Sequence, residues 1–191
     1  TNFVKGIPHF AVNIAVATLE DGELDGLHAG VTYYSLRDEV WVAVEDEGAY
    51  KFASDGYDLV AEDAEATEIS VSDTETVGDS FNSVGIYLKE TTDDFSYLGL
   101  FRYMVAYSQG TRQLGAAAPD IAFVADGTFD TASMKDLKPG DVAPGVLLVR
   151  EAGGTVTDFE RSEAIGDVLE GSIVATNGAL HDDFFDLLGR A

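Results

Sequence analysis

The second half of the chain alternates strand-like and helix-like segments, and this alternation limits the possible folds more than any other feature. From residue 83 onward, β-branched runs such as 172–176 are separated by apolar helical runs such as 116–125. Residues 10–50 instead contain short β-branched and aromatic runs separated by turns, which is typical of antiparallel sheet. The sequence therefore predicts an antiparallel sheet followed by a sheet that helices cover.

The predicted elements follow from these patterns. The predicted strands are 10–17, 29–34, 40–44, a short one from 47, 67–71, 83–88, 111–114, 129–133, 154–158 and 172–176. The predicted helices are 95–108, 116–125, one from Asp141 to Ala152, and 178–188.

Composition excludes several classes of protein. The 191 residues include 35 acidic and 11 basic ones, for a net charge of -24, so nucleic-acid binding through a basic patch is not expected. The absence of cysteine excludes disulfides, thiolate metal sites and a cysteine nucleophile. No apolar run reaches the roughly 18 residues of a membrane span, and no signal peptide is visible. We expect a cytoplasmic protein with no membrane partner.

One helical stretch, GDVAPGVLLVREAGG at residues 140–154, combines burial with a carboxylate. Asp141 is predicted to cap the helix, Pro144 to lie in the first turn, and Gly153 and Gly154 to end it. This stretch alone leaves open whether Asp141 only caps or also carries chemistry. The three histidines, His9, His28 and His181, share no ligand spacing, and we expect structural or solvated roles for them.

The order of several segments resembles the inositol monophosphatase family, closest to its archaeal branch. These segments are TNFVKGIPHFAV at 1–12, EGAY at 47–50, RQLGAAAPD at 112–120, DVA at 141–143, EAGG at 151–154 and ATN at 175–177. The resemblance implies an α/β fold, a layered αβαβα sandwich of the sugar-phosphatase type, with the first layer missing from this chain. Residues 1–80 would then be the remainder of an N-terminal antiparallel-sheet subdomain. Residues 81–191 would be a C-terminal α/β subdomain within one compact unit.

The resemblance also implies site residues. Asp141 matches a carboxylate ligand of catalytic Mg²⁺, a hard cation that prefers oxygen ligands. Arg112, Gly115 and Ala117 match positions that contact the sugar or second phosphate of the substrate, although Arg112 could equally form a surface ion pair. Lys135 lies near the position of a family arginine.

The main catalytic carboxylates of the family are expected upstream of Thr1, in a segment of roughly 80 residues. With Asp141 as the one carboxylate, we expect this chain to bind Mg²⁺ weakly.

The implied function is Mg²⁺-dependent hydrolysis of a phosphate monoester, inositol monophosphate or fructose 1,6-bisphosphate, by a homodimer. Two alternatives stay open at this point. One is a nucleotide 3′-phosphatase of the phosphoadenosine type, and the other is a non-catalytic association domain or fragment.

The acidic residues are dispersed along the chain in short groups, such as 20–23, 45–47 and 182–183, which fits a solvated surface adapted to high salt. We therefore predict that molar potassium chloride stabilises the fold, because screening removes self-repulsion. The measurement is a thermal melt at increasing salt concentration. A melting temperature that stays flat or falls with salt would contradict a halophilic origin.

Overall fold

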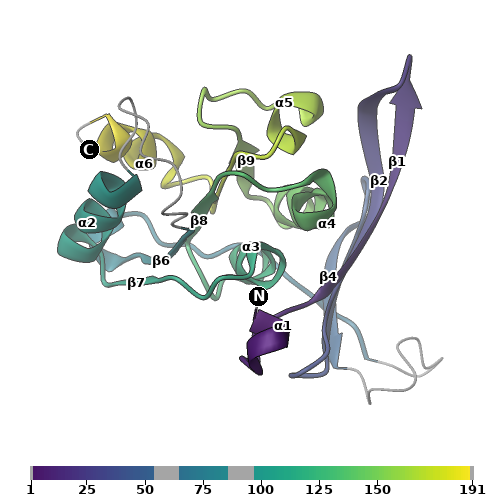
Figure 1. Ribbon diagram of the computed structural model, residues 1–191, viewed down its shortest axis with the longest axis horizontal. Helices are drawn as coiled ribbons and strands as arrows, with labels where there is room; N and C mark the ends of the chain where they lie inside the picture. Colours follow the sequence, from purple (N-terminus) through teal and green to yellow (C-terminus); the bar gives the residue numbers. More distant parts are fainter. Residues whose placement is uncertain (1, 54–64, 86–96, 190–191) are drawn as a thin grey trace.

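Two five-stranded sheets with a pair of helices between them form the framework of the molecule (Figure 1). The computed structural model describes residues 2–53, 65–85 and 97–189. Helices α3 and α4 lie between the sheets, and α4 contacts strands of both. Helices α2 and α6 cover the other face of the second sheet, where they pack together around Leu100, Met104 and Phe184.

The first sheet is antiparallel throughout, in the order β1-β2-β3-β4-β5. Its longest hairpin turns at Asp21 and Gly22, whose φ angles of 52° and 91° fit the two left-handed positions of a tight hairpin turn. The strands are β1 Val12–Glu20, β2 Glu23–Tyr34, β3 Glu39–Val44, β4 Gly48–Ala53 and β5 Thr67–Glu68.

The second sheet is mixed, in the order β7-β6-β8-β10-β9. Strand β6 runs parallel to β7 and β8, whereas β10 runs antiparallel to β8 and β9. Parallel neighbours need crossover connections, and α2 and α3 lie in these connections. The strands are β6 Phe81–Val84, β7 Gly110–Arg112, β8 Thr131–Met134, β9 Thr155–Thr157 and β10 Ile173–Thr176.

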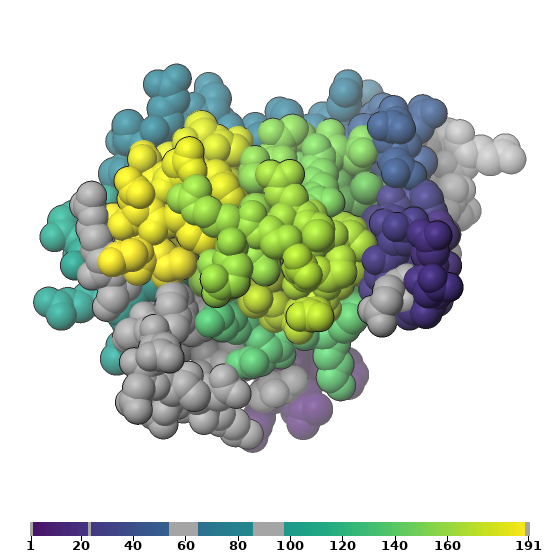
Figure 2. All heavy atoms as spheres, turned by 90° about the horizontal axis from the view of Figure 1, so that it is seen from above, coloured from purple at the N-terminus to yellow at the C-terminus, as the bar shows by residue number. Residues whose placement is uncertain are grey.

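The described α-helices range in length from four residues in α1 to thirteen in α4. In Figure 2 the purple β1–β2 hairpin and the yellow C-terminal helix lie at opposite sides of the molecule, with green segments between them. Among the described residues no helix is both long enough and apolar enough to cross a membrane. The helices are α1 Asn2–Lys5, the 3-10 turn η1 Val77–Asp79, α2 Tyr97–Tyr107, α3 Ala117–Ala125, α4 Pro139–Glu151, α5 Ile165–Leu169 and α6 His181–Leu188.

The inner face of the first sheet packs closely on α4. A Cβ atom added at Gly30 would lie 2.9 Å from the Cα of Pro144, so only glycine lets the strand and the helix approach this far. Trp41 and Ala43 of β3 are fully buried on the same side. The two sheets and the α3–α4 pair therefore share one hydrophobic core.

The outer face of the first sheet is apolar and exposed. Val12, Ile14 and Val16 of β1 are 55 to 61% exposed, and Val44 of β3 is 41% exposed. The β2 residues that pair with them lie on the same face, as Val31 does opposite Ile14. No described helix covers this face, whereas helices cover the other three sheet faces.

The predicted order of strands and helices is largely confirmed, and the errors concern ends and short elements. Strand β2 begins six residues earlier than predicted because residues 23–28 pair with the end of β1. The short helices α1 and α5 were not predicted. Predicted positions 86–88 of a strand and 95–96 of a helix lie outside the described residues.

The predicted start of helix α4 was wrong. The helix begins at Pro139, so the N-cap is Lys138 and Asp141 is the third helical residue. Pro144 consequently lies inside the helix and not in its first turn. It has no N–H to donate to the carbonyl of Gly140, four residues earlier, and this carbonyl needs another partner.

Candidate active site

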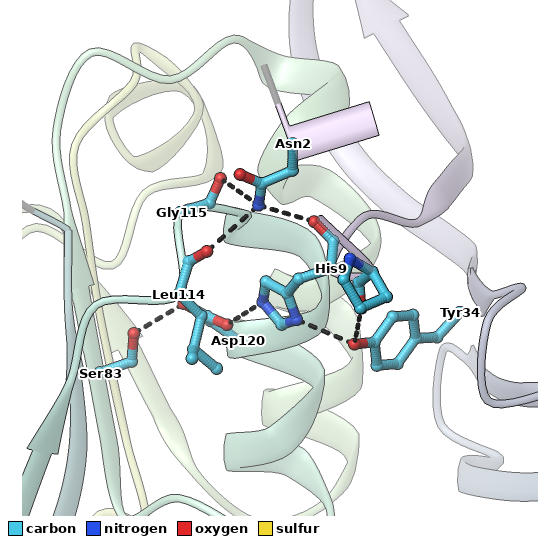
Figure 3. Close-up of polar contacts among 8 residues, drawn as sticks. Asn2, His9, Tyr34, Ser83, Leu114, Gly115 and Asp120 are labelled. Atoms are coloured by element: carbon cyan, nitrogen blue, oxygen red, sulfur yellow. Dashed lines mark hydrogen bonds and ion pairs between the residues drawn. The ribbon is translucent and has the colours of Figure 1, made fainter. Parts of the chain in front are cut away.

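Residues that precede β1 are fastened to the loop that precedes α3. The side-chain amide of Asn2, on α1, donates to the carbonyl oxygens of Leu114 and Gly115 at 3.1 and 3.3 Å. The same nitrogen donates to the carbonyl oxygen of His9 at 2.7 Å (Figure 3). One side chain therefore links the N-terminal segment to the predicted substrate loop at residues 112–117.

A buried polar network continues from His9 into the second half of the chain (Figure 3). Its Nε2 atom lies 2.8 Å from Oδ1 of Asp120, and its Nδ1 atom lies 2.9 Å from the Tyr34 hydroxyl. The Ser83 hydroxyl donates to Oδ2 of Asp120 at 2.7 Å. Asp120 and Ser83 are at most 2% exposed, and His9 is 7% exposed. The network thus joins the segment before β1 to α3 and β6.

The hydrogen-bond directions in this network are fixed by counting donors. The Tyr34 hydroxyl has one proton, which it donates to the Pro8 carbonyl at 2.9 Å. Its oxygen must then accept from the Nδ1–H of His9, which places Nε2 opposite Oδ1 of Asp120. Burial raises the pKa of Tyr34, and the charges of Asp120 and Glu39 act in the same direction while Arg37 opposes them. The neutral hydroxyl that the network needs is therefore the favoured form.

The network contains serine, histidine and aspartate, but it is not a nucleophilic triad. Ser83 and His9 bind opposite oxygens of Asp120, so the imidazole does not contact the Ser83 hydroxyl in this arrangement. A serine nucleophile needs its base within hydrogen-bond reach. The network is a structural link, in line with the structural role expected for His9.

Three of the predicted substrate residues lie together in the loop that Asn2 holds. Gly115 has a φ of 81°, a left-handed conformation that favours glycine, and Ala117 is the first residue of α3. The guanidinium of Arg112 is exposed and lies 4.5 Å from the centre of the Phe81 ring. No carboxylate of the described residues lies within ion-pair distance of Arg112, so the stacked ring takes the place of the alternative surface ion pair.

Lys135, the fourth predicted substrate residue, follows β8. Its ammonium group lies 5.1 Å from the centre of the Phe159 ring, on the segment after β9. This contact is with a different segment from the one that Asn2 holds. The structure therefore groups Arg112, Gly115 and Ala117 and does not establish Lys135 as a member of that group.

One of the two carboxylate oxygens of Asp141 caps the start of α4. Its Oδ2 atom accepts a hydrogen bond of 3.0 Å from the Lys138 amide, while Oδ1 has no hydrogen bond from the described residues. The side chain is exposed at the start of the helix. Capping and a second role are therefore compatible, because one oxygen stays available.

The start of α4 is also tied to the N-terminal segment. The side-chain amide of Asn13, on β1, donates to the carbonyl oxygens of Asp141 and Gly140 at 3.0 and 3.3 Å. The carbonyl of Gly140 has no helical donor, because Pro144 has no N–H. Residues 2–13 thus hold the loop 112–117 at one end and the start of α4 at the other.

A metal ion fits Asp141 as one ligand but not as a complete site. The free Oδ1 atom is the hard anionic donor that Mg²⁺ takes. Within residues 2–53, 65–85 and 97–189, no group of three or more His, Asp or Glu could hold a metal ion. The described residues therefore offer one free carboxylate oxygen at this point and form no complete metal site by themselves.

Comparison with known proteins shows the family of this chain. Residues 1–189 match the model of the inositol monophosphatase family. The chain is 35% identical to an inositol-1-monophosphatase of Caulobacter vibrioides, over 100% of this chain and 68% of that protein. It is also 35% identical to the Nus factor SuhB of Pseudomonas aeruginosa, over 93% of this chain and 59% of that protein.

Solved structures show the same fold. The inositol monophosphatase of Anabaena superposes with a TM-score of 0.79 at 29% identity, covering 100% of this chain and 70% of that one. The suhB protein of Bartonella henselae gives 0.80 at 31% identity, covering 100% and 66%. The class is therefore a mixed α/β fold of two sheets and helices, and the chain belongs to the inositol monophosphatase family. It spans about three fifths to two thirds of the length of these curated relatives.

Sequence reasoning missed the residues that hold the site segments in place. Asn2 and Asn13 are polar residues at the two ends of the first apolar segment, and their partners lie more than a hundred residues away. The sequence does contain one indication of the buried network, because Asp120 is a carboxylate on an otherwise apolar helix face. Such a buried acid needs a partner, and His9 is that partner.

We predict that the His9–Asp120 pair contributes strongly to stability. Replacing either residue with alanine should lower the free energy of unfolding by about 3–5 kcal/mol, because the other partner stays buried without its contact. The double variant should cost little more than either single one. Urea denaturation of the four proteins measures this coupling.

The matched control is the His28–Glu45 pair, which has a similar contact of 2.6 Å but is about half exposed. Its coupling should stay below about 1 kcal/mol. Equal couplings for the buried and the exposed pair would contradict the assigned role of the network.

Proposed function

We propose that this protein is a Mg²⁺-dependent phosphate monoester hydrolase acting on inositol monophosphate, fructose 1,6-bisphosphate or both. Membership of the family and the printed names of its relatives support a phosphatase. The observation that carries the proposal is geometric. Residues 2–13 fasten the loop of Arg112 at Asn2 and the start of α4 at Asn13, so one segment organises both.

The proposed roles follow from the chemistry of each group. Asp141 offers one carboxylate oxygen to a magnesium ion, which neutralises phosphate charge and lowers the pKa of a bound water. The N–H groups at the start of α4 favour an anion nearby. The exposed guanidinium of Arg112 binds a second anionic group of the substrate through two parallel hydrogen bonds. The other magnesium ligands are proposed to come from carboxylates upstream of Thr1.

Several finer features of the proposal stay predictions. A position in the archaeal branch stays a prediction, because the relatives reported above are bacterial. A cytoplasmic location, a halophilic origin and a homodimer likewise stay predictions. The nucleotide 3′-phosphatase alternative differs only in the substrate that the loop 112–117 selects.

A non-catalytic association domain is the second candidate function. The exposed apolar face of the first sheet favours it, since Val12, Ile14 and Val16 form the kind of surface that a partner covers. The single carboxylate of the described site agrees with it as well. The two candidates differ in whether the protein releases phosphate.

The first test concerns Asp141 and magnesium. Phosphate release is measured for the 191-residue chain and for a polypeptide extended upstream of Thr1 by the expected carboxylates. The extended protein should be active, and Asp141→Asn should lower its kcat by several orders of magnitude, since a negative metal ligand is lost. The fold should survive, because asparagine can also accept the hydrogen bond from Lys138.

Asp136→Asn is the matched control, since Asp136 is an exposed aspartate with a φ of 56°, which asparagine adopts readily. It should keep full activity. Two results would count against the proposal. Full activity of the Asp141→Asn protein would show that Asp141 only caps the helix. A lack of activity in both the 191-residue chain and the extended polypeptide would favour the association domain.

The second test concerns Arg112. Arg112→Ala should raise KM for fructose 1,6-bisphosphate by roughly 10- to 100-fold, because one charge-assisted contact is lost. A small monophosphate should be affected much less. Arg102→Ala, at an exposed arginine on α2, is the control and should change neither KM. Equal losses on both substrates, or a lower melting temperature that accounts for the loss, would show that Arg112 acts only in the fold.

A further inference from the structure

Asn13 makes an unusual pair of contacts at the start of α4. Its amide nitrogen reaches two successive carbonyl oxygens, those of Gly140 and Asp141, at 3.3 and 3.0 Å. Both oxygens belong to the first turn of the helix. The contacts cross from the first sheet to the interior helix layer, so they join two elements that are remote in sequence.

The orientation of this amide is held by Thr32 on the neighbouring strand. The Thr32 hydroxyl, in a fully buried residue, donates to Oδ1 of Asn13 at 2.9 Å. Carbonyl oxygens only accept, so the nitrogen of Asn13 must face Gly140 and Asp141 while its oxygen faces Thr32. The strand pairing of Asn13 with Thr32 keeps the two side chains adjacent.

These contacts fix Asp141 from several directions. Its N–H donates to the Lys138 carbonyl at 2.8 Å, and its Oδ2 accepts from the Lys138 amide at 3.0 Å. Its carbonyl accepts from Asn13. The remaining carboxylate oxygen, Oδ1, therefore projects from a residue whose backbone and side chain are both restrained.

We propose that Asn13, oriented by Thr32, is a positioning residue for the carboxylate of Asp141. It acts through the backbone of Asp141 and does not itself touch the ion or the substrate. The inference rests on the proposed role of Asp141 as a magnesium ligand. Residues that orient a metal ligand typically change metal affinity by about 10- to 100-fold when they are replaced.

A purely structural role of Asn13 is the competing explanation. Pro144 leaves the carbonyl of Gly140 without its helical donor, and Asn13 replaces that donor. On this explanation Asn13 stabilises the helix and has no specific effect on metal binding. The two explanations differ in what Pro144→Ala does, because alanine restores the helical N–H to Gly140.

The experiment measures affinity for Mn²⁺, by electron paramagnetic resonance of the free ion, in high potassium chloride. It uses whichever protein releases phosphate, the 191-residue chain or the polypeptide extended upstream of Thr1. Asn13→Ala should lower the affinity about 10-fold, and Thr32→Val should lower it less. The magnesium concentration for half-maximal activity should rise in parallel, while KM for the substrate stays unchanged.

Asn177→Ala is the matched control. Asn177 is a buried asparagine whose amide also bridges to backbone carbonyls, those of Ser72 and Thr74, at 3.3 and 2.8 Å. Its replacement should lower the melting temperature and leave Mn²⁺ affinity unchanged. Adding Pro144→Ala to Asn13→Ala should recover stability without recovering affinity.

Three results would overturn the inference. Unchanged Mn²⁺ affinity in Asn13→Ala is one, and equal losses in Asn13→Ala and Asn177→Ala are another. Recovery of affinity by Pro144→Ala is the third, since Asn13 would then only replace the missing helical donor. A separate result, equal Mn²⁺ binding by the wild type and Asp141→Asn, would remove the metal role of Asp141 and the inference with it.

Discussion

The side-chain amide of Asn13 resolves a conflict that the sequence of α4 creates. Pro144 packs against Gly30 at a distance that brings the helix and the first sheet close together, but it leaves the Gly140 carbonyl without a donor. The exposed Gly140 carbonyl, which has no helical donor, accepts a hydrogen bond from Asn13 of β1 instead. The same contact fixes the neighbouring residue, Asp141. Close packing of the core and the geometry of the candidate site therefore depend on one interaction.

The second half of the candidate site is held by a different mechanism. Asn2 binds the backbone of the loop before α3, while His9 binds Asp120 within α3 itself. The His9–Asp120 pair lies in the interior of a chain with a net charge of -24, where an unpaired carboxylate would be costly. Pairing with His9 and with Ser83 satisfies both oxygens of Asp120. The loop that carries Arg112 thus rests on a helix anchored by a buried polar link.

The sequence predicts the elements well and the tertiary contacts poorly. Strand β3 was predictable at residues 40–44 because β-branched and aromatic residues favour strands locally. The start of α4 was not, because Asp141 suits both the cap and the third helical position, and the contact from β1 decides between them. Family resemblance predicts roles for Asp141 and Arg112, which stay predictions, but it gave no indication of Asn13, whose partner lies 128 positions away.

The central claim is that the loop 112–117 and the start of α4 form one site, organised by residues 2–13. The most direct test is an NMR titration of the ¹⁵N-labelled protein with fructose 1,6-bisphosphate and Mg²⁺. The account predicts that amide signals of residues 112–117 and 139–142 shift together and fit one dissociation constant. Shifts confined to one of these segments, or two different dissociation constants, would contradict it.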